Sequence, residues 1–231
     1  ATMQLPQPWW DGGEIKDKTL FVHVDQGIGD AILCARFLPQ AADRVGRLIL
    51  AAHKGLGRFF KGFDPRIEMV EIGDPWPTFD FHVDLFSLPA MFAAGPGAMP
   101  LPPYVAAEPA LAKRWRKRLD GPGMKVGLAW QGNPQNPRDE EKSIPFRELK
   151  PILSVPGVRF FGLQVGHGAD QAKKPPKGID FTPLGEELGA ARHGMIDTAA
   201  VVANLDLVIS IDSAIAHLTA AMGRPLWVLV Y

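Results

Sequence analysis

The chain has 231 residues, enough for one large domain or for two of about 100–120 residues each. Hydrophobic residues make up 46% of it and charged residues 22%, an ordinary globular composition that argues against global disorder. The 25 basic and 25 acidic residues cancel, so the net charge gives no sign of a polyanionic partner. We therefore predict no nucleic-acid partner, although a local basic pocket for a small phosphorylated ligand stays open.

Cys34 is the only cysteine, which excludes an intrachain disulfide and a cysteine cluster for zinc or iron–sulfur. The apolar runs, such as residues 199–211, are interrupted by Asn and Asp and are too short to span a bilayer. The N-terminal residues show no basic segment followed by an apolar core, so no signal peptide is predicted. We expect a cytoplasmic protein with at most peripheral membrane contact.

In the first half, short apolar runs alternate with helical patterns. Residues 4–13 are rich in Pro, Trp and Gly and predict an extended segment pinned by aromatic side chains. Strands are predicted at 19–24, 47–52 and 67–72, helices at 30–44 and 56–63, and a strand running into a helix at 79–92. This alternation with short connections predicts a parallel, doubly wound sheet.

The second half repeats this pattern after a Pro- and Gly-rich stretch at 95–109, which is a candidate linker. Helices are predicted at 110–121, 146–153, 196–205 (capped by Asp197) and 213–223, and strands at 124–130, 158–164, 206–212 and 225–231. We predict two Rossmann-like domains, residues 1–108 and 109–231. Because the last predicted element is a strand without a covering helix, we expect the final C-terminal helices of the fold to be missing.

The stretch "HVDQGIGDAILCARFLP" (23–39) predicts a strand, a glycine turn and a helix. A dinucleotide fingerprint requires a third glycine, and Ile32 stands at that position, so pyrophosphate binding here is weakly supported. Two interpretations of Asp30 remain. It caps the helix, or it is an ionised carboxylate, stabilised by the helix N-terminus, that acts as a general base.

The stretch "ISIDSAIAHLTAAMG" (209–223) predicts a strand, the Asp212-Ser213 turn and a helix. The backbone N–H groups and the hydroxyl at the start of this helix suit a diphosphate. His217 falls on the same face about one turn later and could reach a phosphate. The alternatives are that His217 is a satisfied, half-buried histidine and that Asp212 is only an N-cap.

The polar stretch "WQGNPQNPRDEEKSIPF" (130–146) begins where a predicted strand ends, at the edge where open α/β sheets bind ligands. Lys142 and Arg138 could neutralise a leaving diphosphate, and Asn133 could position a sugar. Gln164 ends the next strand and is expected at the same edge. The alternative is a solvated loop whose charges do nothing specific.

Other polar residues give no functional signal. The adjacent carboxylates at 139–141 indicate solvation rather than catalysis. The basic residues of the helix at 113–118, and the histidines at 53, 82, 167 and 193, have no spacing typical of a metal site.

Together these stretches resemble glycosyltransferase family 9, the ADP-heptose:lipopolysaccharide heptosyltransferases. The resemblance is greater still to the glycosyltransferase-like domain that follows tetratricopeptide repeats in many bacterial proteins. It rests on "LPQPWWDG" (5–12), "HVDQGIGDAILCARFLP" (23–39), "VGLAWQGNP" with "KSIP" (126–134, 142–145) and "DLVISIDSAIAHLTAAMGRPLWVLV" (206–230). The resemblance implies a GT-B fold, in which two Rossmann-like domains face a cleft.

The resemblance also implies an inverting sugar transfer from a nucleotide-diphospho-sugar to an acceptor hydroxyl, with no cofactor and no required metal. Asp30 matches the carboxylate proposed as the base, and Lys142 matches the basic residue near the donor phosphates. The donor loop corresponds to Asp212, Ser213, Ala214, Ile215 and His217, and the acceptor-side loop to Gln26, Gly27 and Gly29. Two residues depart from the family pattern, because Ser213 replaces Thr and Ala214 replaces Gly.

Three functions stay open at this point. The first is a glycosyltransferase whose acceptor is a saccharide, a lipid-linked sugar or a protein. The second is a non-catalytic nucleotide-sugar or protein-binding module that keeps the GT-B fold. The third is a GT-B sugar-nucleotide epimerase or hydrolase.

Overall fold

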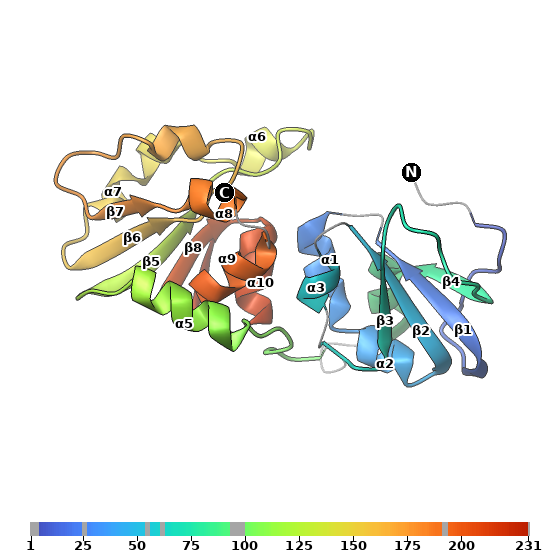
Figure 1. Cartoon of the computed structure of the whole chain (residues 1–231). Helices are drawn as coiled ribbons and strands as arrows, with labels where there is room; N and C mark the ends of the chain where they lie inside the picture. The colour runs from blue at the N-terminus through green and yellow to red at the C-terminus, as the bar shows by residue number, and fades with distance from the viewer. Residues whose placement is uncertain are drawn as a thin grey trace. The chain divides into compact units, whose positions relative to one another are not determined.

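The computed structural model describes residues 5–24, 27–53, 56–60, 63–92, 100–190 and 194–230. The chain divides into two compact units, Ala1–Tyr104 and Val105–Tyr231 (Figure 1). The boundary predicted from the sequence lies a few residues further along.

Unit 1 is a four-stranded parallel sheet with helices between the strands. Its elements are β1 (Ile15–His23), α1 (Ile28–Ala35), α2 (Leu38–Ala42), β2 (Val45–Ala52), α3 (Gly57–Phe60), β3 (Ile67–Glu71), β4 (Phe81–Asp84), the 3-10 turn η1 (Leu85–Ser87) and α4 (Leu88–Phe92). The strand order is β3-β2-β1-β4. The chain therefore starts at an inner strand, builds outward and then crosses to the other side of β1.

The inner strands of unit 1 are buried on both faces. Leu20, Phe21 and Val22 are successive residues of β1 and are all 0% exposed, as expected for a parallel strand covered on both sides. On one face, Phe21 packs with Ile49 of β2, and Phe79 lies against this cluster. The continuous apolar runs of the sequence are therefore the core of the sheet, as predicted.

The helix predicted at 30–44 is in fact two helices, α1 and α2. The chain breaks at Arg36 and Phe37, and Pro39 stands in the first turn of α2. Proline has no N–H to donate and its ring clashes with the preceding turn, so a single helix cannot continue through this position. The prediction of one long helix is wrong for that reason.

Unit 2 is a five-stranded parallel sheet of order β7-β6-β5-β8-β9. Its elements are α5 (Pro109–Arg118), β5 (Met124–Ala129), α6 (Asp139–Lys142), η2 (Phe146–Leu149), α7 (Lys150–Leu153), β6 (Val158–Gly162), η3 (Ala169–Ala172), β7 (Phe181–Pro183), α8 (Gly185–Ala190), α9 (Met195–Val202), β8 (Leu207–Ile211), α10 (Ala214–Ala221) and β9 (Leu226–Leu229). Sequence patterns did not predict α6, β7 or α8, which are short. The α/β class with two parallel sheets is confirmed.

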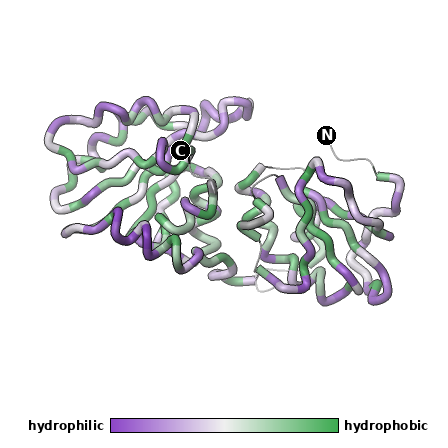
Figure 2. Tube along the Cα trace, viewed as in Figure 1, coloured by the Kyte–Doolittle hydropathy of each residue, from purple (hydrophilic) through white to green (hydrophobic). Residues whose placement is uncertain are grey.

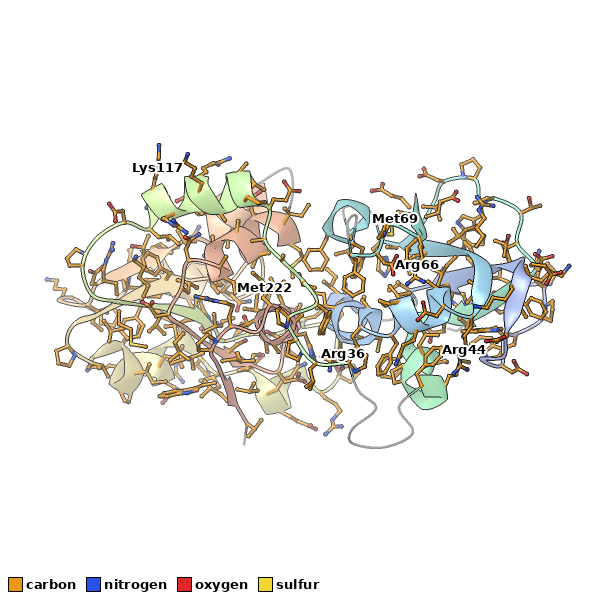
Figure 3. All side chains as sticks on the ribbon, turned by 90° about the horizontal axis from the view of Figure 1, so that it is seen from below. Arg36, Arg44, Arg66, Met69, Lys117 and Met222 are labelled. Carbon is orange, nitrogen blue, oxygen red and sulfur yellow. The ribbon has the colours of Figure 1, made fainter. Side chains whose placement is uncertain are left out.

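The two faces of the unit 2 sheet are covered by different elements. On one face Trp130, Phe146 and Phe160 belong to a cluster of buried aromatic and aliphatic side chains. On the other face lie α5, α9 and α10 (Figure 1). Figure 2 shows the strands as mostly apolar and α5 as strongly hydrophilic on its outer side. In Figure 3 the labelled Lys117 of α5 points away from the sheet.

Asp197 joins α5 to α9 instead of capping a helix. The N-cap of α9 is Gly194, and Asp197 lies in the first turn, where it is 2% exposed. Its Oδ1 accepts a hydrogen bond of 2.8 Å from Nε1 of the buried Trp115. The predicted capping role is therefore wrong, because the carboxylate satisfies a buried indole N–H on the neighbouring helix.

Among the described residues, no helix is both long enough and apolar enough to cross a membrane.

Candidate functional site

Each sheet has one point where the strand order reverses. In unit 1 this point lies between β1 and β4, and in unit 2 between β5 and β8. Open α/β sheets bind ligands outside the carboxyl ends of the strands at such a reversal. The loops singled out from the sequence follow β1, β5 and β8. The topology therefore places the three predicted stretches at the two reversal points.

At the unit 2 reversal point, the structure brings together three predicted donor-site residues. The Lys142 Nζ lies 3.7 Å from Oδ2 of Asp212, and the His217 Nε2 lies 3.5 Å from its Oδ1. The Lys142 side chain is 27% exposed, that of His217 26% and that of Asp212 62%. Partly exposed pairs at this separation are weak, so an incoming anion can compete with Asp212 for both nitrogen groups.

Helix α10 begins beside this cluster. Its N-cap is Ser213, so the interpretation of Asp212 as a cap is wrong. The Ser213 side chain makes no capping bond and instead shares a 2.9 Å hydrogen bond with the hydroxyl of Ser210. The N–H groups of the first turn are thus not used by a capping side chain, and Ala214 and Ile215 belong to this turn. Such a helix start is suited to an anion.

Gln164 clamps the beginning of the loop that carries Lys142. Its Oε1 accepts hydrogen bonds from the N–H groups of Trp130 and Gln131, and its Nε2 donates to the carbonyls of Gln131 and His167. Gln164 is 7% exposed, so these bonds satisfy a buried amide. Its position beside the end of β5 agrees with the expected sheet edge.

Asp139 closes the same loop, contrary to the prediction that residues 139–141 are solvated. It is 6% exposed, and its Oδ2 accepts a 3.0 Å hydrogen bond from Oγ of Ser143. The same Oγ accepts a 3.1 Å bond from the N–H of Gly132. Asp139 is the first residue of α6, a short helix that no sequence pattern predicted, and the helix turns the carboxylate inward.

Two other predicted donor-site residues make local contacts on this loop. The side chain of Asn133 accepts a 3.0 Å bond from the N–H of Gln135. Arg138 is 81% exposed at its side chain and pairs with Glu141 at 2.9 Å. Their contact with a donor stays a prediction.

At the unit 1 reversal point, Gly27 is the N-cap of α1 and Asp30 lies in its first turn. The interpretation of Asp30 as a cap is therefore wrong, because the helix begins before it. Gly29 lies inside the same turn, and Gln26 lies outside the described residues. The half-buried carboxylate of Asp30 is thus placed at a helix start, and its role as a base stays a prediction.

A second carboxylate, Asp84, lies near Asp30 and was not singled out from the sequence. It ends β4, and its Oδ1 accepts a 3.1 Å bond from the N–H of Phe86. Asp30, Asp84 and the half-exposed Phe86 line one shallow depression. The only signal was positional, since Asp84 is the last residue of β4, which the topology places beside β1.

Both carboxylates also affect Cys34 on α1. Burial, together with the repulsion of the thiolate by Asp30 and Asp84, raises the pKa of this thiol to about 12. Cys34 is thus a neutral core residue and no nucleophile at physiological pH.

Within the described ranges, no three His, Cys, Asp or Glu side chains come together in a way that could hold a metal ion.

Residues 140–230 match the model of glycosyltransferase family 9 (heptosyltransferase). The protein FlbA of Caulobacter vibrioides is 28% identical over an alignment of 250 residues in length. The alignment covers 98% of this chain and 41% of that protein. The chain therefore spans about two fifths of the length of this curated relative.

Three solved structures share the fold at low sequence identity. The family 9 glycosyl transferase of Veillonella parvula DSM 2008 matches with a TM-score of 0.64 at 12% identity, over 95% of this chain and 82% of that one. The E. coli ADP-heptose lps heptosyltransferase II matches with a TM-score of 0.62 at 12% identity, over 92% of this chain and 84% of that one. The E. coli heptosyltransferase WaaC, solved with ADP-2-deoxy-2-fluoro heptose, gives 0.56 at 14%, over 91% and 88%.

The family match covers the segment from α6 to β9, which includes Lys142, Asp212 and His217. The chain has the α/β fold with two parallel sheets seen in these heptosyltransferases, and its residues 140–230 match glycosyltransferase family 9.

Proposed function

We propose that the chain is an inverting glycosyltransferase that moves a sugar from a nucleotide-diphospho-sugar to an acceptor hydroxyl. The observation that supports this most is the cluster of Lys142, Asp212 and His217 at the unit 2 reversal point, beside the start of α10. Two nitrogen groups and an uncapped helix start face one position, which suits the two phosphates of a donor.

In this proposal the donor binds unit 2. The diphosphate replaces the contacts that Asp212 makes with Lys142 and His217, and the N–H groups of Ser213 and the residues after it bind phosphate oxygens. As the bond to the sugar breaks, negative charge builds on the diphosphate, and Lys142 and the helix dipole stabilise that charge. These groups supply positive charge directly, so the proposal includes no metal and no cofactor.

The acceptor binds unit 1, where Gly27 and Gly29 leave room beside Asp30. Asp30 takes the proton of the acceptor hydroxyl while its oxygen attacks the anomeric carbon from the face opposite the diphosphate. The new glycosidic bond forms as the old bond breaks, the nucleoside diphosphate leaves with the electron pair, and the configuration inverts. Positioned bases of this kind typically raise the reaction rate about 10²–10⁴-fold.

The donor class follows from the relatives. The E. coli WaaC structure contains an ADP-sugar analogue, so an ADP-sugar is the first donor to test. A saccharide, a lipid-linked sugar or a protein is the acceptor class. The proposal keeps the cytoplasmic location, at most peripheral membrane contact, and the closeness to domains that follow tetratricopeptide repeats.

The test measures release of nucleoside diphosphate from ADP-, UDP- and GDP-sugars, with each acceptor class supplied in turn. We expect release from one donor that depends on acceptor, resists EDTA, and yields a product with inverted anomeric configuration by NMR. Asp30→Asn should reduce release about 10²–10⁴-fold but leave nucleotide binding intact. Unchanged release in this variant would contradict the assignment of the base, and donor binding without turnover would favour the non-catalytic module.

A further inference from the structure

A buried carboxylate that the proposed function does not use lies one turn before Lys142. Asp139 is 6% exposed, and its Oδ1 is buried without a hydrogen-bond partner among the described residues. An unpaired buried carboxylate oxygen is unfavourable unless positive charge lies close by. The structure therefore requires an explanation for this oxygen.

The other oxygen of Asp139 takes part in a chain of hydrogen bonds that connects the two ends of the Lys142 loop, which we call the tie. Ser143 donates its hydroxyl to Asp139 at 3.0 Å and accepts the N–H of Gly132 at 3.1 Å. The N–H of Ser143 also donates to the carbonyl of Asp139 at 2.9 Å. Gly132 follows β5 closely and Ser143 follows Lys142 directly, so the tie fixes the backbone from which the lysine side chain extends.

Oδ1 of Asp139 and Cε of Lys142 both lie close to the position that a side chain on Gly132 would occupy. A Cβ atom added to Gly132 would overlap Oδ1 of Asp139 and would lie 3.3 Å from Cε of Lys142. Glycine at position 132 therefore leaves the space that both side chains need in this arrangement. Beyond this point the ammonium group reaches Asp212, at 3.7 Å.

We propose that Asp139 is a positioning residue of the donor site. Through Ser143 and Gly132 it fixes the loop that carries Lys142, and the charge of its unpaired oxygen holds the lysine side chain at the unit 2 reversal point. A cation held in place before the ligand arrives loses less conformational freedom on binding. The identity of the ligand, a nucleoside diphosphate, rests on the proposed function. The hydrogen bonds that form the tie do not depend on that function.

Calorimetric titration with ADP tests the inference in a set of variants. Asp139→Asn keeps the size and an acceptor for Ser143 but removes the charge, and Ser143→Ala removes the tie but keeps the charge. Glu140→Gln is the matched control, because Glu140 is an exposed carboxylate on the same helix. Lys142→Gln, alone and combined with Asp139→Asn, shows whether Asp139 acts through the lysine.

We expect Lys142→Gln to weaken ADP binding about tenfold or more, as for a lost charge-assisted hydrogen bond. Asp139→Asn and Ser143→Ala should each weaken it about three- to tenfold, and Glu140→Gln should leave it unchanged. In the Lys142→Gln background, Asp139→Asn should have no further effect. An equal effect of Asp139→Asn in both backgrounds, or an effect no larger than that of Glu140→Gln, would overturn the inference.

Failure of the proposed function gives a different result. If the wild-type chain binds neither ADP nor inorganic pyrophosphate, the donor assignment is contradicted, and hydrogen exchange at the amide of Gly132 decides the inference. Asp139→Ala should speed this exchange, with folding checked by circular dichroism, and Glu140→Gln should not. Unchanged exchange in a folded Asp139→Ala variant would show that the tie does not hold the loop.

Discussion

The two units present opposite chemistry at the same place in the same topology. Both sheets start from an inner strand and reverse beside it. In unit 1 the reversal carries the carboxylates of Asp30 and Asp84. In unit 2 it carries Lys142 and His217 around Asp212, next to an uncapped helix start. Under the proposed function, the shared strand order predicts where ligands bind, and the side chains decide which ligand each unit takes.

The two reversal points also differ in how firmly they are built. The Lys142 loop is held by Gln164 at its beginning and by Asp139 and Ser143 at its end. Asp30 lies in the first turn of α1, whose N-cap, Gly27, has no side chain, and no hydrogen bond to its carboxylate is found among the described residues. We infer that unit 2 is organised for a ligand of fixed shape, the diphosphate, and unit 1 for a more variable acceptor.

The largest expected effect concerns Asp30, the proposed base in unit 1. Asp30→Asn should reduce sugar transfer about 10²–10⁴-fold, because the acceptor hydroxyl loses its base, while ADP affinity stays unchanged. Initial rates and calorimetry check the two parts separately. Asp74→Asn, an exposed carboxylate of the same unit, is the control. Loss of ADP affinity in Asp30→Asn would place the nucleotide in unit 1 and contradict the division of roles.

The next effect breaks the unit 2 loop. Gly132→Ala introduces a Cβ that overlaps Asp139 and crowds Lys142, so we expect a loss of about 1–3 kcal/mol in the free energy of unfolding. Urea denaturation measures this loss. Gly57→Ala is the control, since its nearest non-local contact would be an ordinary 3.8 Å. Equal stability of both variants would show that the loop is not packed as described.

A smaller effect is expected from Asp212, whose carboxylate pairs with Lys142 and His217 in unit 2. Asp212→Asn removes the carboxylate that competes with phosphate for Lys142 and His217. The free energy at stake in such exposed pairs is about 0.2–1 kcal/mol, so ADP affinity should rise up to about fivefold at low salt. Raising the salt concentration should reduce the gain. A tenfold loss of ADP affinity would mean that Asp212 binds the nucleotide directly.

The smallest effect concerns Cys34, which reports on both unit 1 carboxylates. Its pKa is about 12 in the folded chain against 9.0 for a free thiol. Because folding raises this pKa, Cys34 does not lower the free energy of unfolding below about pH 9. The free energy of unfolding falls as the pH rises from there toward 12. Rates of iodoacetamide labelling across this range measure the shift. Asp30→Asn should lower the pKa of Cys34, and an unchanged value would place Asp30 away from α1's core face.

Much of the fold could be predicted from the sequence, because parallel strands buried on both faces appear as continuous apolar runs. β1, β2, β5 and β8 are examples. Short elements escaped prediction: β7 has three residues and α6 four, too few to show a period. The break between α1 and α2 was missed although Pro39 is visible in the sequence.

The candidate site was predictable where its residues lie in the loops and helix starts that come after neighbouring strands. Lys142, Asp212 and His217 come together because β5 and β8 are neighbours, and the motifs named all three. Asp139 was misread because its burial depends on the tie through Ser143, and sequence patterns do not show such a contact. Asp84 was missed because its proximity to Asp30 follows from the pairing of β1 with β4.

The most direct test of the division of roles is a residue-resolved NMR titration of the labelled chain with ADP. The account predicts that the largest amide shift changes occur at Gly132, Lys142 and residues 213–217 of unit 2. Changes concentrated at residues 27–31 of unit 1, with residues 213–217 unaffected, would contradict it.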